Sequence, residues 1–259
     1  MERHINLIKL LLIATLFINQ LKAKDIEFSI FELTNIAQKI YFNECSSKLK
    51  YLVYWNDAEC FASIGIGHFI WYPEGRKKKF DESFPKLLTF MKHRGVILPS
   101  WLDDNMTNPW KNKEEMEKDP RSQELREFLQ QTISIQAFFM ARRINKALPK
   151  ILTATDDSRH AKITDMFDKV ANADGGYYLL IDYVNFKGEG VKESERYAKK
   201  GWGLLQVLEC MKDTTHPKAE FARCAKKVLT TRVENSPKER NESKWLKGWF
   251  TRINTYTGN

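Results

Sequence analysis

Glu44 is the residue whose place in the sequence most strongly indicates acid catalysis. Apolar residues recur at Leu33, Ile36 and Ile40, which is the spacing of one helical face, and Glu44 continues this stripe. A carboxyl group on the buried side of a helix end loses hydration, and this raises its pKa. A general acid needs a proton that it still holds near neutral pH, so we predict this role for Glu44. The alternative is a helix-end carboxylate that only pairs with a neighbouring lysine.

The segment after Glu44 has the pattern of a β-hairpin with one nearly bare face. Residues 49–55 alternate in character and predict a strand, residues 56–59 have the polar chemistry of a turn, and residues 60–69 resume the extended pattern. A serine and two glycines of the second strand then fall on one face. Glycine costs a strand stability, so it often marks a place where a ligand meets the backbone. We expect a sugar ring to lie on this face.

The order of these features resembles the catalytic core of the T-even phage-type lysozymes, within the wider lysozyme-like superfamily. The features are Glu44, a turn that carries Asp57, and the run Ser-Ile-Gly-Ile-Gly-His that begins at Ser63. The resemblance implies that Glu44 is the general acid, that Asp57 helps with water or charge, and that Ser63 lies in the same cleft. It gives His68 a structural role. The chain departs from the family in a longer loop after the acid, in Cys45 where glycine is usual, and in serine for threonine.

Five further residues are predicted to bind substrate or to support the cleft. Gly65 and Gly67 leave room for a sugar, and Trp71 and Tyr72 offer aromatic faces on which a sugar can stack, with core packing as the alternative for these rings. Arg240 lies in a turn before the last helix. The phage-type family has a similar arginine-centred turn, and this resemblance implies structural support of the cleft.

Helical periodicity dominates the rest of the chain. It predicts one long helix over residues 120–147, another over 157–170, and later helices after residues 178 and 201. The resemblance, which extends in order and length over residues 30–256, implies an α+β, mostly helical, lysozyme-like fold. We expect a small β-hairpin lobe at about 44–118 and a larger helical lobe at about 148–259, joined by the long helix.

The N-terminus and the charge indicate an exported protein. Residues 1–23 combine a short basic start, an apolar run and a small residue, Ala23, as a secretory signal peptide does, with an uncleaved anchor as the alternative. The catalytic domain is then residues 24–259. A formal net charge of +9 favours anionic surfaces such as cell-wall polymers. We expect a secreted or periplasmic protein.

The cysteines predict disulfides. An even number in an exported chain indicates two bridges, and proximity in the sequence favours Cys45–Cys60 and Cys210–Cys224, with reduced, buried cysteines as the alternative.

The sequence therefore predicts a secreted peptidoglycan muramidase that acts on glycan strands. The alternatives are a lytic transglycosylase with a lone catalytic Glu44, and a cell-wall-binding protein of the same fold without activity. The chain has no nucleic-acid motif, and its five histidines are scattered, so we expect no nucleic-acid partner, no metal and no cofactor. We expect a monomer with no membrane association once the signal peptide is removed.

Overall fold

The computed structural model describes residues 28–76, 78, 80–103, 106–212 and 214–258. This part of the chain is mostly helical, which confirms the predicted α+β, mostly helical class. It also has a three-stranded antiparallel sheet and a two-stranded one, in which β4 (Arg196–Tyr197) pairs with β5 (Lys200–Gly201). The predicted signal peptide lies outside the described residues. The helices are α2 (Ile30–Cys45), α3 (Phe84–His93), α4 (Ser100–Asp103), α5 (Lys113–Lys118), α6 (Pro120–Gln131), α7 (Ile133–Thr153), α8 (Asp157–Ala171), α9 (Gly176–Lys187), α10 (Leu204–Cys210), α11 (Pro217–Glu234) and α12 (Ser243–Asn254).

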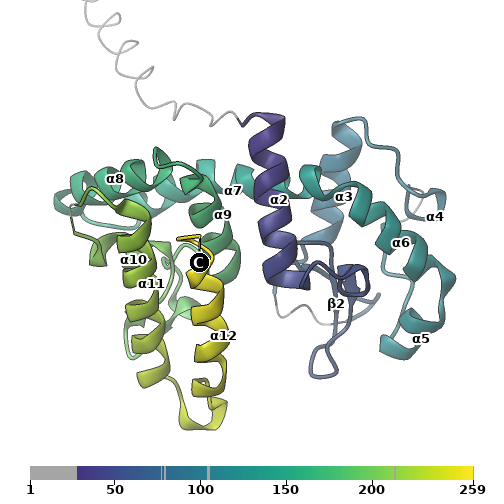
Figure 1. Cartoon of the computed structure of the whole chain (residues 1–259). Coiled ribbons are helices and arrows are strands. Elements are labelled where there is room, and N and C mark those ends of the chain that lie inside the picture. The colour runs from purple at the N-terminus through teal and green to yellow at the C-terminus, as the bar shows by residue number, and fades with distance from the viewer. Residues whose placement is uncertain (1–27, 77, 79, 104–105, 213, 259) are drawn as a thin grey trace, which may run out of the picture.

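The elements form two groups on either side of the central helix α2 (Figure 1). One group contains the sheet and α3–α6, and the other contains α8–α12. Helix α7 passes behind α2 and extends into both groups, and it packs against α2, α3, α8 and α9. In the described residues no helix is long and apolar enough to cross a membrane.

Helix α2 is stabilised at both ends by local contacts. The Ser29 hydroxyl accepts a hydrogen bond from the backbone N–H of Glu32, and the Glu32 carboxylate accepts one from the backbone N–H of Ser29. The helix ends at Ser46, which has a left-handed φ of 49° and donates its N–H to the carbonyl of Phe42. The chain therefore turns sharply directly after Glu44 and Cys45.

The three-stranded sheet lies in the predicted hairpin region, and its strands are shorter than predicted. Its strands are β1 (Val53–Tyr54), β2 (Ala62–Ile64) and β3 (Phe69–Trp71), paired in that order and antiparallel. Residues 49–52 form a 3₁₀ helix instead of the start of a strand. Residues 65–68 form a turn, because Gly65 and His68 adopt left-handed φ values of 71° and 47°. The predicted bare strand face is thus divided between a strand and a turn.

The predicted helix over residues 120–147 is two helices, α6 and α7, with a break at Thr132. The Thr132 hydroxyl donates a hydrogen bond to the carbonyl of Phe128, a side-chain contact that competes with the regular helical ladder. Gln136, fully buried at the start of α7, accepts from the N–H of Ile66 and donates to the carbonyl of Leu129. This side chain fixes the β2–β3 turn against α7.

One of the two predicted disulfides is present. Cys210 and Cys224 are bridged, with Cα atoms 5.7 Å apart, and join the end of α10 to α11. The predicted Cys45–Cys60 bridge is wrong, since both residues are free thiols. Cys45 points into the core, where burial raises the pKa of its thiol to about 12, whereas Cys60 is exposed. Their side chains therefore face different environments.

Candidate functional site

Glu44 lies where the two groups of helices meet, and three segments contact its carboxylate. Its side chain is 13% exposed. Arg252 of α12 donates to Oε1 at 2.6 Å, and Asn185 of α9 donates to the same oxygen at 3.3 Å. His68 of the β2–β3 turn places Nδ1 3.4 Å from Oε2. Both carboxylate oxygens therefore have fixed partners.

Arg252 is itself held by a second, fully buried carboxylate. Its Nε and Nη2 atoms donate to the two oxygens of Asp182 at 2.9 and 2.8 Å, in a bidentate pair. The hydroxyl of Tyr256 donates to Asp182 at 2.6 Å. The Arg252 guanidinium thus pairs with two carboxylates, Asp182 on α9 and Glu44 at the end of α2.

The surroundings of Glu44 favour the ionised form of its carboxyl group in the free protein. Burial acts to raise its pKa, as the sequence predicts, but the charge of Arg252, the charge of His68 and the hydrogen bonds from Arg252 and Asn185 outweigh it, and the pKa is lowered. The carboxylate is therefore ionised at neutral pH. The predicted raised pKa is wrong for this state, because the sequence revealed the burial but not the cation.

His68 reaches Glu44 because the turn that carries it is tightly constrained. Its backbone has φ 47°, and its Nε2 lies 3.9 Å from the Cys45 thiol. A side chain at Gly65 would place Cβ 2.3 Å from the Gln136 amide oxygen. The glycine lets the backbone approach α7 closely, and this positions the imidazole over the end of α2.

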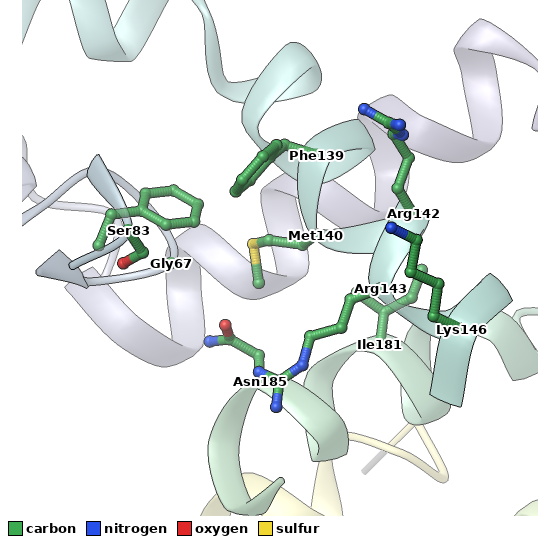
Figure 2. Close-up of a pocket in the computed structure, with 10 residues that line it drawn as sticks. Gly67, Ser83, Phe139, Met140, Arg142, Arg143, Lys146, Ile181 and Asn185 are labelled. Carbon is green, nitrogen blue, oxygen red and sulfur yellow. The ribbon is translucent and has the colours of Figure 1, made fainter. Parts of the chain in front are cut away.

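A cavity of about 370 Å³ adjoins this cluster between the β2–β3 turn, α7 and α9 (Figure 2). We call it the α7 pocket. Glu44 is not among its lining residues, but Asn185, which donates to Glu44, is. Figure 2 shows Phe139 and Met140 projecting into the space between Gly67 and Asn185. Its lining residues are Gly67, Phe69, Ser83, Phe139, Met140, Arg142, Arg143, Lys146, Ile181 and Asn185.

In the described part of the chain, Asp57 and Ser63 form no hydrogen bond or ion pair with Glu44. The Asp57 side chain is 82% exposed, and its oxygens accept from Lys113 Nζ at 2.9 and 3.1 Å. Ser63 is in the middle of β2, opposite Tyr54 and Ile70 in the two pairings. Neither residue has a described hydrogen bond to the glutamate. Glu44 is consequently the only predicted catalytic residue whose side chain joins the cluster.

Most of the other predicted site residues have structural roles. Trp71 is fully buried and Tyr72 is 2% exposed, so neither ring offers a face to a sugar. Gly67 lines the α7 pocket, where a Cβ would come within 2.6 Å of the Phe69 ring. Arg240 pairs with Glu242 at 3.0 Å and does not contact Glu44.

The arginine that supports the site is Arg252, twelve positions after the predicted one. A usable signal was present in Asp182, which lies in the apolar core helix that the sequence predicted, because a buried carboxylate requires a cation. Asn185 follows on the same helix one turn later. The sequence does not indicate the partner of either residue. Arg252, for example, lies 70 residues after Asp182.

Comparison with known proteins identifies no relative. No family model matches the chain, and no curated protein or solved structure matches it. The described residues also contain no group of three or more histidine, cysteine, aspartate or glutamate side chains arranged to hold a metal ion.

Proposed function

We propose that this protein is a glycosidase that cuts the glycan strands of peptidoglycan, with Glu44 as the general acid. The observation that carries the proposal is the position of Glu44, a nearly buried carboxylate with both oxygens held, at the junction of the two groups of elements and next to a cavity. A polymer bound at this junction can contact both groups of elements, and the carboxyl group of Glu44 then lies where it can protonate a glycosidic oxygen. The resemblance of residues 44–68 to phage-type lysozymes supports the same assignment.

Glu44 must gain a proton before it can act as an acid. A bound sugar excludes water and strengthens the effect of burial, which raises the pKa of a carboxyl group. Arg252 already donates two hydrogen bonds to Asp182. If its guanidinium moves slightly toward Asp182, the positive charge moves away from Glu44 while the guanidinium keeps a carboxylate partner. We therefore expect protonation of Glu44 to accompany glycan binding, and the proton then passes to the leaving-group oxygen.

The first candidate reaction is hydrolysis, which makes the protein a muramidase. A second candidate, the lytic transglycosylase, is favoured by the ion pair that Asp57 forms with Lys113, because that reaction needs no second carboxylate to activate water. In hydrolysis a water molecule attacks the sugar carbon and the product gains a water. In the lytic reaction a hydroxyl of the same sugar attacks, and the product is an anhydro sugar, lighter by one water.

The decisive experiment is mass spectrometry of the products formed from purified peptidoglycan. Glu44→Gln keeps the shape of the side chain but cannot deliver a proton, so we expect a loss of cleavage of about 10²–10⁴-fold with the fold intact. Glu220→Gln is the matched control, because Glu220 also pairs with an arginine, Arg223 on α11, and we expect its activity to be unchanged. Near wild-type turnover by the Glu44 variant removes this residue from the mechanism.

Two other outcomes are informative. Anhydro products from the wild type assign the lytic reaction. If the wild-type protein binds glycan strands without cleaving them, the assignment becomes a cell-wall-binding protein without activity. The Cys210–Cys224 disulfide is compatible with the oxidising compartment in which the substrate is found, and we propose a secreted or periplasmic location.

A further inference from the structure

A second cavity, of about 450 Å³, lies between the β4–β5 hairpin, α8, α10 and α11, and we call it the α10 pocket. Helices α10 and α11, which form two of its walls, pack against each other (Figure 1). The pocket shares no lining residue with the α7 pocket. Among the described residues that line it, the charged ones are five bases and one acid: Arg159, Arg196, Lys199, Lys200, Lys227 and Glu209.

The acidic residue neutralises one of the two arginines. Glu209 accepts a hydrogen bond at 2.6 Å from Nε of Arg159. Arg196 has a weaker contact, since its Nη1 lies 3.6 Å from a carboxylate oxygen of Glu193, whose side chain is 89% exposed. The Nε atom of Arg196 is buried and, within the described residues, has no hydrogen-bond partner. The Arg196 guanidinium is therefore only partly satisfied by the protein.

The three lysines of the pocket have no counter-ion in the part of the chain that the structure describes. Lys199 and Lys200 come from the β4–β5 hairpin and Lys227 comes from α11, and all three are exposed. Like charges gathered at one cavity repel one another, and an anion that binds between them relieves this repulsion. The arrangement therefore favours an anionic ligand.

Covalent and hydrogen-bonded contacts fix the walls of the pocket before any ligand binds. The Cys210–Cys224 bridge joins the end of α10 to α11, and Cys210 itself lines the pocket. At the start of α10, the Gln206 side chain accepts from the N–H of Gly203 at 2.9 Å and donates to the carbonyl of Gly190 at 3.1 Å. Walls fixed in this way lose little conformational entropy when a ligand binds.

The turn of the β4–β5 hairpin holds Lys199 in an unfavourable backbone conformation. Ala198 and Lys199 form the two-residue turn between the paired residues Tyr197 and Lys200, with left-handed φ values of 45° and 63°. Turns of this kind favour asparagine, aspartate and glycine, because other residues strain the backbone there. The hydroxyl of Tyr197 donates at 2.9 Å to the fully buried carboxylate of Glu242, which anchors the hairpin. Backbone strain that the surrounding contacts maintain is typical of ligand sites.

We infer that the α10 pocket binds a diphosphate group, which Lys199 contacts from the hairpin and Lys227 contacts from α11. The inference goes beyond the proposed function and does not depend on it. A single carboxylate would neutralise one cation and leave the others, whereas two linked phosphates carry several negative charges and many acceptor oxygens. The partly satisfied guanidinium of Arg196 can pair with phosphate oxygens through its planar fork. A cavity of about 450 Å³ has room for such a group, because a water molecule occupies only about 30 Å³ in the liquid.

The test is isothermal titration calorimetry of the full chain with inorganic pyrophosphate, and with sulfate at the same ionic strength. We expect tighter binding of pyrophosphate. The double variant Lys199→Gln/Lys227→Gln should weaken this binding about tenfold, because it removes two charge-assisted contacts with the anion. The matched control Lys244→Gln/Lys247→Gln removes the same charge from exposed positions of α12 outside the pocket and should leave the affinity unchanged.

A second variant and a second measurement support the titration. Lys200→Gln, a single exposed change on the same hairpin, should also weaken pyrophosphate binding. Pyrophosphate should raise the midpoint of thermal unfolding of the wild type and the control, and raise it less for the pocket variants, since a ligand that binds the folded state stabilises it. Circular dichroism establishes that each variant is folded.

Three outcomes overturn the inference: no binding of pyrophosphate to the folded wild type, equal affinity for pyrophosphate and sulfate, and equal weakening by the two double variants. The last result would mean that the overall net charge, and not the pocket, attracts the anion. Liposomes distinguish the possible sources of a diphosphate. Retention of the wild type on liposomes of diacylglycerol pyrophosphate, but not on those of phosphatidylcholine, assigns a lipid headgroup, whereas binding of the free anion without retention assigns a soluble ligand.

Discussion

Replacing Arg252 by methionine tests the reasoning about the buried ion-pair cluster. The side chain is 10% exposed and donates three hydrogen bonds, of 2.6–2.9 Å, to Glu44 and Asp182. Removing one partner of a buried ion pair costs about 3–5 kcal/mol, because the other charge remains without compensation. We expect a loss of this size in the free energy of unfolding at pH 7, measured by urea denaturation with circular dichroism.

The same variant should respond to pH in a way that identifies Glu44. In the wild type the folded-state pKa of Glu44 is lowered, so its stabilising contribution is present above the ordinary glutamate pKa of 4.5 and is lost as the pH falls through the lowered pKa. In the variant burial is opposed only by His68 and Asn185, so the pKa of Glu44 rises above its wild-type value. The penalty for the buried charge is relieved as the pH falls from neutral through that higher pKa. The difference in stability between the two proteins should therefore narrow between pH 7 and about 4.5.

Two controls sharpen this experiment. Arg252→Lys keeps the charge without the planar pairing geometry and should lose less stability than methionine. Arg240→Met removes a half-exposed arginine whose partner Glu242 retains Arg232, and it should cost at most about 1 kcal/mol. A loss below about 1 kcal/mol for Arg252→Met, or a difference that does not narrow on acidification, would refute the reasoning.

Three further predictions concern the hairpin and the cysteines. Gly65→Ala should lower the free energy of unfolding by about 1–3 kcal/mol in urea, because the backbone has φ 71° and the new Cβ would meet an amide oxygen of α7; an unchanged midpoint contradicts this. Non-reducing peptide mapping should recover Cys210 joined to Cys224, and replacing both by alanine should cost about 2–4 kcal/mol; recovery of both as free thiols rules the bridge out. Asp57→Asn should leave strand cleavage unchanged, since its carboxylate binds Lys113; a loss of 10²-fold would restore it to the mechanism.

Local patterns in the sequence located most of the helices but not the contacts between them. The stripe of Ile36, Ile40 and Glu44 correctly placed the glutamate on the buried face at the end of a helix, because helical periodicity is a local property. Arg252 could not be assigned to it, since the contact spans 208 residues and depends on how α12 packs against the rest of the chain.

Two errors have the same origin. Cys45 and Cys60 are close in sequence, but a left-handed turn at Ser46 and the 3₁₀ helix that follows direct the intervening chain so that one thiol is buried and the other exposed. Trp71 follows the hairpin as a cleft aromatic would, yet its indole N–H donates to the carbonyl of Met106 inside the core. Residue type and spacing do not reveal which face of a short strand the later chain will cover.

The contact between Glu44 and Arg252 also sets an order of events during synthesis. Glu44 leaves the ribosome 208 residues before the arginine that compensates its charge. Until α12 has been made, the end of α2 carries a carboxylate that is stable only in contact with water, and α9 carries Asp182 in the same condition. Neither can be buried without a large cost. Closing the two groups of elements around Glu44 therefore costs free energy in a nascent chain, and the cluster of Glu44, Arg252 and Asp182 is completed only after α12 has been synthesised.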